Sequence, residues 1–282
     1  CKRKKEPYMG MYNLVGGKIE KENDGLNEAY RELEEETNIK KKDIEAWSLK
    51  GEISFYLNNY DNAISCFKNV LNLSQNKERH AATYEWLGDC YESKEEYENA
   101  LYFYQESIRL NQFLCIEDTR LYISCLACML VLERFEECET LAKKCIIMFP
   151  DMSIFHNYYA EVCLAQDKKK EGKNAFIKSL EIDPEQFSVN VAVGIMYFDC
   201  KDYKNALEYF HKTYDLDPNE QAALLLACTY FKIKDMQKAK DFFTIAYEKN
   251  HNSAKIFLEK CPESQNFINN ILETKNKETN EK

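Results

Sequence analysis

Three of the five prolines in this 282-residue chain stand at equal intervals: Pro150, Pro184 and Pro218 are each 34 residues apart. A fixed period of roughly 20 to 50 residues is typical of a chain that repeats one supersecondary unit. Because proline cannot continue a helix, each of these residues also predicts a helix end. The spacing therefore predicts a repeat architecture rather than a single globular core.

The segment from Phe187 to Pro218 shows what one repeat contains. It divides into two amphipathic helices joined by the short turn CKDY. Gly194 and Ala206 stand where these helices approach each other closely, since a larger side chain would hold them apart. Aromatic residues supply the bulk that fills the remaining space, namely Tyr197, Tyr203 and Phe210.

The same register recurs elsewhere in the chain. Two upstream copies are strong, with Trp47, Gly51, Tyr60, Ala63 and Phe67 in the first and Tyr84, Leu87, Gly88, Tyr91, Tyr97, Ala100 and Tyr104 in the second. Weaker copies run from Tyr122 to Pro150 and from His156 to Pro184, and a sixth carries Leu226, Ala227, Tyr230, Ala239, Phe243 and Ala246. The third copy departs most, with Leu126 at the small position and Ala142 at the aromatic one.

These residues resemble tetratricopeptide repeats over about Ile44 to His251. The resemblance implies an all-α fold, a right-handed α-solenoid of about six helix pairs whose stacking leaves a concave groove. We expect the solenoid at residues 44–251 and C-terminal capping helices at 252–273, one of them with Phe267, Ile268, Ile271 and Leu272 on one side. The tail 274–282 has no apolar residue, which predicts disorder.

Residues 1–43 are not repeat-like. Between Met11 and Ile39 the sequence reads as a strand, a Gly-Gly turn and a helix, and it resembles the Nudix box: Gly17, Arg31, Glu32, Leu33, Glu35, Glu36 and Ile39 match, whereas Asn23 and Asn38 depart. The resemblance implies Mg²⁺ held by Glu32, Glu35 and Glu36, and hydrolysis of a nucleoside diphosphate derivative.

The Nudix-like segment is too short for a complete domain of that family, which needs well over about 100 residues to supply its sheet. We therefore expect residues 1–43 to be an incomplete domain, a strand-turn-helix remnant, and the chain alone to be non-enzymatic and without a cofactor. The alternative is a Nudix-type Mg²⁺-dependent hydrolase, active in a longer parent chain, with the repeats as a targeting arm.

Charge and cysteine usage narrow the function classes. With 48 acidic and 38 basic side chains and a net charge of −10, the acidic balance of the chain argues against a general nucleic-acid binder, whose phosphate contacts need clustered lysine and arginine. Its longest apolar stretch, Leu121 to Leu132, is too short to span a membrane. Twelve scattered cysteines, including the CxxC of Cys125 and Cys128, read as buried hydrophobes in a reducing, cytoplasmic setting. A lipid-bearing Cys1, as in a surface lipoprotein, is a third alternative.

The groove implied by the resemblance predicts the partner. Its register places Glu45, Glu52, Glu85, Asp89 and Glu92 in the first two pairs, and Ile123, Ala127, Leu130, Ile154, Asn157, Leu164, Val191, Ile195, Phe198, Leu224, Cys228 and Phe231 in the last four. We expect a protein or peptide partner with basic residues at one end and apolar anchors at the other. Some members of the family bind the acidic C-terminal tail of a partner. The matching positions here carry acidic side chains, which would repel a carboxylate, so we exclude that class of partner. Alternatively, the apolar residues pack against neighbouring helices or under the helix at 267–272.

Overall fold

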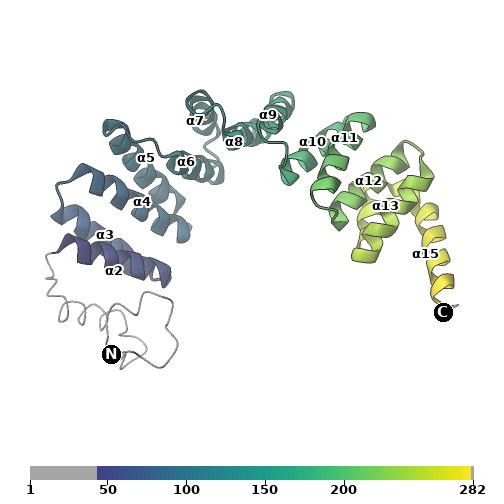
Figure 1. Cartoon of the computed structure of the whole chain (residues 1–282), viewed down its shortest axis with the longest axis horizontal. Coiled ribbons are helices and arrows are strands. Elements are labelled where there is room, and N and C mark those ends of the chain that lie inside the picture. Colours follow the sequence, from purple (N-terminus) through teal and green to yellow (C-terminus); the bar gives the residue numbers. More distant parts are fainter. Residues whose placement is uncertain (1–42, 281–282) are drawn as a thin grey trace. The chain divides into compact units, whose positions relative to one another are not determined.

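The computed structural model describes residues 43–280, with side chains through Glu273. Contacts divide the chain into two compact units, Cys1–Leu141 and Ala142–Lys282, here called unit 1 and unit 2 and described separately. Every regular element within 43–280 is a helix (Figure 1), which confirms the predicted all-α fold of stacked helix pairs. The Nudix-like residues 11–39 lie outside this range.

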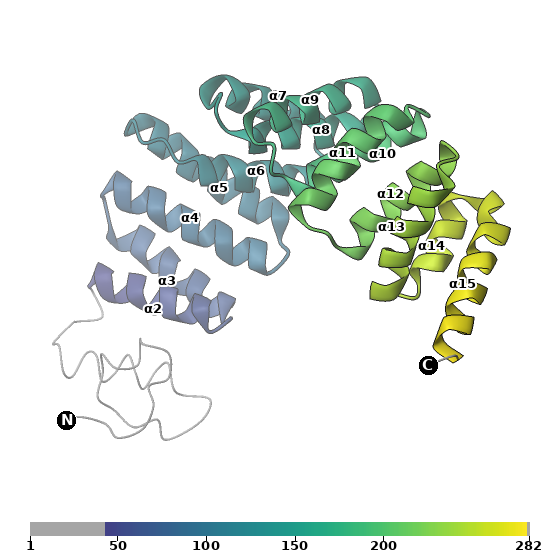
Figure 2. The same ribbon diagram turned by 45° about the vertical axis from the view of Figure 1, so that its right-hand side comes forward.

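In unit 1, each helix packs against the next one along the chain, and α2 also contacts α4. The helices are α2 (Ile44–Tyr56), α3 (Tyr60–Leu73), α4 (Lys77–Ser93), α5 (Tyr97–Phe113) and α6 (Thr119–Val131), followed by α7 (Phe135–Met148), which ends in unit 2. Figures 1 and 2 both show α2 to α5 stacked side by side. The even-numbered helices are thus the first members of successive pairs.

Unit 2 continues the same pattern. Its pairs are formed by α8 (Ser153–Ala165) with α9 (Lys169–Ile182), α10 (Phe187–Asp199) with α11 (Tyr203–Leu216), and α12 (Glu220–Lys232) with α13 (Met236–Lys249). The C-terminal elements are α14 (Ser253–Lys260), the 3₁₀ turn η2 (Pro262–Ser264) and α15 (Gln265–Asn280). Because α14 contacts both α12 and α13, the last pair does not end in solvent.

The two helices of each pair are joined by one recurring turn. The second residue after the first helix has a positive φ in every such turn within the described residues: Asn58, Glu95, Glu133, Asp167, Lys201 and Lys234, with φ between 56° and 66°. In several turns a polar side chain then caps the second helix, as Asn59 and Asp202 do by accepting a backbone N–H. Because most of these residues are neither glycine nor asparagine, the conformation is imposed by packing of the pair rather than by local preference.

Glycine at the helix crossing has the steric role that the sequence predicts. A Cβ atom added to Gly88 would lie 2.4 Å from the ring of Tyr104, and one added to Gly194 would lie 2.4 Å from the ring of Phe210. Both rings are fully buried. The first pair repeats this arrangement with Gly51 and Phe67. The absence of a side chain on one helix is therefore what admits an aromatic ring from the other.

The C-terminal helices cover the last pair. Phe257 of α14 and Ile268 and Ile271 of α15 form one buried cluster with residues of α12 and α13. The structure differs from our expectation over residues 274–280, where α15 continues as a helix through Asn280 instead of giving way to a disordered tail. This stretch holds no glycine or proline, and its lysine and glutamate residues are good helix formers, so nothing in the sequence ends the helix.

Candidate protein-interaction surface

The first helices of the pairs carry the residues predicted to contact a partner. We call the residues predicted on α2, α4 and α6 the first-helix face of unit 1, and those on α8, α10 and α12 the first-helix face of unit 2. Glu52 lies on α2, Glu85, Asp89 and Glu92 lie on α4, and the half-buried Ile123 lies on α6. The acidic residues are thus brought together in unit 1, on helices that contact each other.

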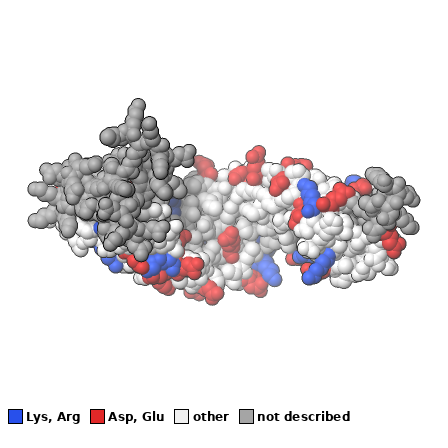
Figure 3. Space-filling view, turned by 90° about the horizontal axis from the view of Figure 1, so that it is seen from below, with Lys and Arg blue, Asp and Glu red and all other residues white. Residues whose placement is uncertain are grey.

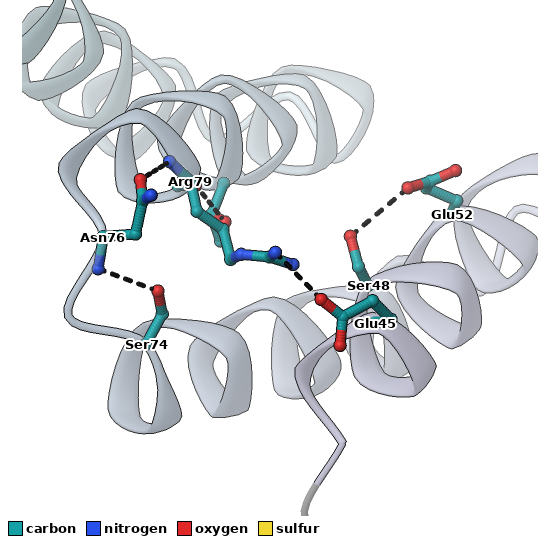
Figure 4. Close-up of polar contacts among 7 residues, drawn as sticks. Glu45, Ser48, Glu52, Ser74, Asn76 and Arg79 are labelled. Carbon is teal, nitrogen blue, oxygen red and sulfur yellow. Dashed lines mark hydrogen bonds and ion pairs between the residues drawn. The ribbon is translucent and has the colours of Figure 1, made fainter. Parts of the chain in front are cut away.

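Two arginines compensate part of this acidic face. Arg79, at the start of α4, pairs with Glu45 of α2 at 2.9 Å (Figure 4), and Arg120, at the start of α6, pairs with Glu85 at 2.8 Å. Asn76 fixes the start of α4 by accepting the backbone N–H of Arg79. One partner of each pair is well exposed, so each contributes less than about 1 kcal/mol to stability. Glu45 and Glu85 are therefore already paired with an arginine side chain.

The ion-paired glutamates titrate differently. The pKa of Glu45 is lowered, first by a backbone hydrogen bond and further by Arg79. Burial raises the pKa of Glu85, and Arg120 opposes that shift. Glu85 is therefore the more desolvated of the two, and its charge depends more on keeping its arginine.

Three acidic side chains on this face form no ion pair with an arginine or lysine of the described residues, although Arg120 also acts to lower the pKa of Asp89. Glu52 accepts a hydrogen bond from the Ser48 hydroxyl at 3.3 Å (Figure 4). Asp89 and Glu92 both accept from the Tyr104 hydroxyl of α5, at 2.8 Å and 2.5 Å. Among the described residues, no lysine or arginine forms an ion pair with any of the three. We call Glu52, Asp89 and Glu92 the acidic row.

The Tyr104 hydroxyl explains how two of these carboxylates are held. Phe67 and Phe210 occupy the matching place in other pairs, so the hydroxyl is an addition to an otherwise apolar crossing. Burial, and then the neighbouring Asp89, raise the pKa of Tyr104 far above its usual value, which keeps the hydroxyl protonated. Burial also raises the pKa of Asp89, against the lowering effect of this hydrogen bond. Because one hydroxyl carries one proton, it donates to only one of the two carboxylates at a time.

Charge is distributed unequally between the two units. Residues 43–141 carry 18 acidic and 8 basic side chains, a net charge of −10, whereas residues 142–273 carry 19 and 17, a net charge of −2. On the face of the molecule drawn in Figure 3, side chains of both signs are interspersed with large areas that carry neither. The excess of negative charge is therefore a property of unit 1, spread over several helices.

The predicted residues of α8 and α10 are placed less uniformly. Asn157 donates its amide to the Gln186 side chain at 2.7 Å, and its buried Oδ1 has no hydrogen-bond partner. Val191 is buried, with 8% of its surface exposed, and Ile195 and Phe198 are half-buried. Ile195 and Phe198 are thus the predicted apolar residues of α10 that keep accessible surface.

The predicted residues of α12 are covered. Leu224 and Cys228 belong to the buried cluster that α14 and α15 complete. The ring of Phe231 lies 5.7 Å from that of Phe257 and 5.1 Å from that of Phe267. For Leu224 and Phe231 the structure therefore shows the arrangement that we gave as the alternative, packing under the C-terminal helices.

Sequence reasoning missed the partners that define the acidic row. Arg79 and Arg120 lie 34 and 35 residues from the glutamates they pair with, and no local pattern links them. Tyr104 was assigned only to packing, although its hydroxyl is what distinguishes it from Phe67 and Phe210. A polar atom at a position where the other strong copies carry phenylalanine was the available signal.

Metal clusters and membrane-spanning helices were both looked for among the described residues. Within 43–273, no three His, Cys, Asp or Glu side chains are arranged to hold a metal ion, and Cys125 and Cys128 are buried. None of the helices described in this range is both long and apolar enough to cross a membrane. The predicted Mg²⁺ ligands Glu32, Glu35 and Glu36 lie outside the described residues, so their role stays a prediction.

Comparison with known proteins bears on the repeats. Residues 43–112 match the family described as tetratricopeptide repeat. Human protein O-mannosyl-transferase TMTC3 is 28% identical over 92 residues, which is 32% of this chain and 10% of that protein. The chain thus spans only a small part of the length of this curated relative.

Solved structures extend the likeness along the chain. The C-terminal part of a TPR repeat-containing protein from Cytophaga hutchinsonii superposes with a TM-score of 0.67 at 15% identity, covering 85% of this chain and 95% of that one. The structure of pilF from Pseudomonas aeruginosa superposes with a TM-score of 0.59 at 16% identity, covering 77% of this chain and 97% of that one. YrrB, described as a TPR protein with an unusual peptide-binding site, superposes with a TM-score of 0.51 at 19% identity, covering 70% of this chain and 96% of that one. These identities establish similarity of fold: the chain has the fold of tetratricopeptide repeat proteins, and its residues 43–112 carry that family's sequence pattern.

Proposed function

We propose that this chain is a non-enzymatic scaffold that binds a partner protein, and that the first-helix face of unit 1 recognises a basic segment of that partner. The observation that carries the proposal is the acidic row, three carboxylates that form no ion pair with a lysine or arginine of the described residues, within residues 43–141, whose net charge is −10. A repeat fold shared with a protein described as having a peptide-binding site supports the general class.

The chemistry of the acidic row favours a cationic side chain. The Tyr104 hydroxyl satisfies one of Asp89 and Glu92 at any moment, which leaves acceptor capacity on the other. Because Asp89 is partly desolvated, its attraction to a lysine or arginine is screened less than that of a fully solvated carboxylate. A carboxylate from a partner is repelled here, in keeping with our exclusion of acidic tails.

Unit 2 is proposed to contribute apolar contacts. Ile195 and Phe198 keep accessible surface on α10, within residues 142–273, whose net charge is only −2. We therefore propose a partner with both basic and apolar residues, and a cytoplasmic setting, since the free cysteines of this chain suit a reducing compartment.

Calorimetric titration of the full chain with a synthetic lysine-alanine peptide tests the basic half. The variant Glu52→Gln/Asp89→Asn/Glu92→Gln is expected to weaken binding about tenfold at low salt, and added salt is expected to weaken binding to the unsubstituted chain. Glu136→Gln, an exposed acid on α7, is the matched control and is expected to change affinity less than twofold. Equal weakening by the control, or none by the triple variant, contradicts the proposal.

The Nudix alternative needs its own assay. Mg²⁺-dependent hydrolysis of a nucleotide sugar or of ADP-ribose, lost in Glu35→Gln, would favour the hydrolase. We expect no turnover above buffer, because a sheet positions the metal-binding helix in that family and residues 43–280 form helices only.

A further inference from the structure

Two buried thiols of unit 2 lie against each other. Cys228 is on α12 and Cys261 directly follows α14, and their exposed fractions are 4% and 0%. The Cys261 thiol donates to the backbone carbonyl oxygen of Cys228, with 3.9 Å between Sγ and O. Two cysteines 33 residues apart in sequence are thereby direct neighbours in one buried cluster.

The contact between these two cysteines makes their thiols chemically unequal. It lowers the pKa of Cys261, with help from Lys232, and raises the pKa of Cys228 together with burial. By contrast, burial raises the pKa of both Cys90 and Cys128 to about 12. The thiolate is the reactive form of cysteine. A lowered pKa therefore favours the reactive form of Cys261, whereas a raised pKa disfavours it in Cys90 and Cys128.

The position of Cys261 gives the pair a structural consequence. It joins α14 to η2 and belongs to the same buried cluster as Phe257 and Ile268. Nearby, Lys232 of α12 pairs with Glu263 of η2 at 2.7 Å, an exposed contact that is weak by itself. A bond at Cys261 would therefore fix the C-terminal elements where they cover α12.

We propose that Cys228 and Cys261 form a reversible disulfide that fastens α14 and the segment after it onto α12. With hydrogen peroxide as oxidant, the Cys261 thiolate attacks one peroxide oxygen, which forms a sulfenic acid and releases hydroxide, protonated to water. The Cys228 sulfur then attacks the sulfenic sulfur, the S–S bond forms, and the S–OH oxygen leaves as a second water. Two electrons pass from the two sulfurs to the peroxide, and two equivalents of an external thiol reverse the change by exchange.

The disulfide would change how the C-terminal helices open. In the reduced chain, α14 and α15 can separate from α12 by local unfolding, because they are held by packing and one exposed ion pair. In the oxidised chain the residues between 228 and 261 form a closed loop, so that opening is restricted. Leu224 and Phe231 then stay covered.

Peptide mapping without reduction tests the bond. The chain is prepared with the exposed Cys115 and Cys200, and also Cys1, replaced by serine, so that only internal thiols react. After treatment with stoichiometric hydrogen peroxide we expect a cross-linked peptide containing Cys228 and Cys261, which dithiothreitol removes. The cross-link is expected to persist in Cys145→Ala, whose buried thiol has a raised pKa, and to be lost in Cys261→Ala.

Hydrogen exchange tests the consequence without any further substitution. Oxidation is expected to slow backbone exchange in α14 at least about tenfold, with recovery on reduction. Three outcomes overturn the proposal: no Cys228–Cys261 peptide, accumulation of sulfenic or sulfinic acid at Cys261 without a cross-link, or a cross-link that leaves exchange in α14 unchanged.

Discussion

The second helix pair of unit 1 and the pair α10–α11 of unit 2 are built on one packing plan and carry different chemistry. In both, a glycine admits a fully buried aromatic ring, Tyr104 against Gly88 and Phe210 against Gly194. In unit 1 the ring carries a hydroxyl that holds two carboxylates. In unit 2 the matching ring, Phe210, carries no hydroxyl, and α10 has the half-buried apolar side chains Ile195 and Phe198.

This difference separates what makes the fold from what selects a partner. The crossing between paired helices depends on side-chain volume, which both pairs satisfy in the same way. The first helices carry the same net charge in both units, −2 for α2, α4 and α6 together and −2 for α8, α10 and α12 together, but the acidic side chains of α2 and α4 lie close to one another. Substitutions at the crossing should therefore affect the two units alike, and substitutions on the outer face should not.

The largest expected effect is loss of either buried ring. Tyr104→Ala and Phe210→Ala are each expected to lower the local free energy of unfolding by about 4 kcal/mol, because each leaves a large cavity. Hydrogen exchange in α4 and α10 measures the two effects separately. Tyr102→Ala, with a side chain 58% exposed, is the control and is expected to cost less than about 0.5 kcal/mol. A cost as small as that of the control for either ring would break the claim of a shared packing plan.

A smaller effect is expected from filling the glycine positions. Gly88→Ala and Gly194→Ala each place a Cβ 2.4 Å from a ring and are expected to cost about 2 kcal/mol, after the gain in helix propensity. Gly172→Ala would place its Cβ 2.9 Å from the Leu164 side chain and 3.0 Å from the Ala160 carbonyl oxygen, which are less severe overlaps than 2.4 Å, so its cost should be lower. Thermal unfolding, monitored by hydrogen exchange, ranks the stability of the three variants. An equal cost at Gly172 would show that the aromatic ring is not the decisive neighbour.

The smallest effect concerns Asp89 and sharpens the chemical difference. Its pKa is raised in the folded chain, so its contribution to stability is fully present below its unfolded pKa and is lost as pH rises through the folded pKa. Asp89→Asn, which keeps an acceptor for Tyr104, is thus expected to stabilise unit 1 by less than about 1 kcal/mol at pH 7 and to have no effect near pH 3. Urea unfolding at both pH values checks this. A destabilising effect at pH 7 would contradict the assigned direction.

The sequence predicted the packing better than the site. The 34-residue proline spacing and the paired glycine and aromatic positions are local, periodic signals, and the crossings follow them. The pairing of Arg79 with Glu45 depends on side-chain conformations across two helices, which no period encodes. The burial of Leu224 and Phe231 depends on the path of the chain through η2, where a single 3₁₀ turn directs α15 back onto the last pair.

The central claim is that the acidic row, rather than the negative charge of the chain as a whole, is the recognition surface. Hydrogen-exchange footprinting of the full chain with the lysine-alanine peptide tests it most directly, because it locates binding on individual helices. We predict slower exchange in α2 and α4 and no change in α10 or α12. Protection spread over unit 2, or a footprint on α4 that persists in Glu52→Gln/Asp89→Asn/Glu92→Gln, would contradict the account.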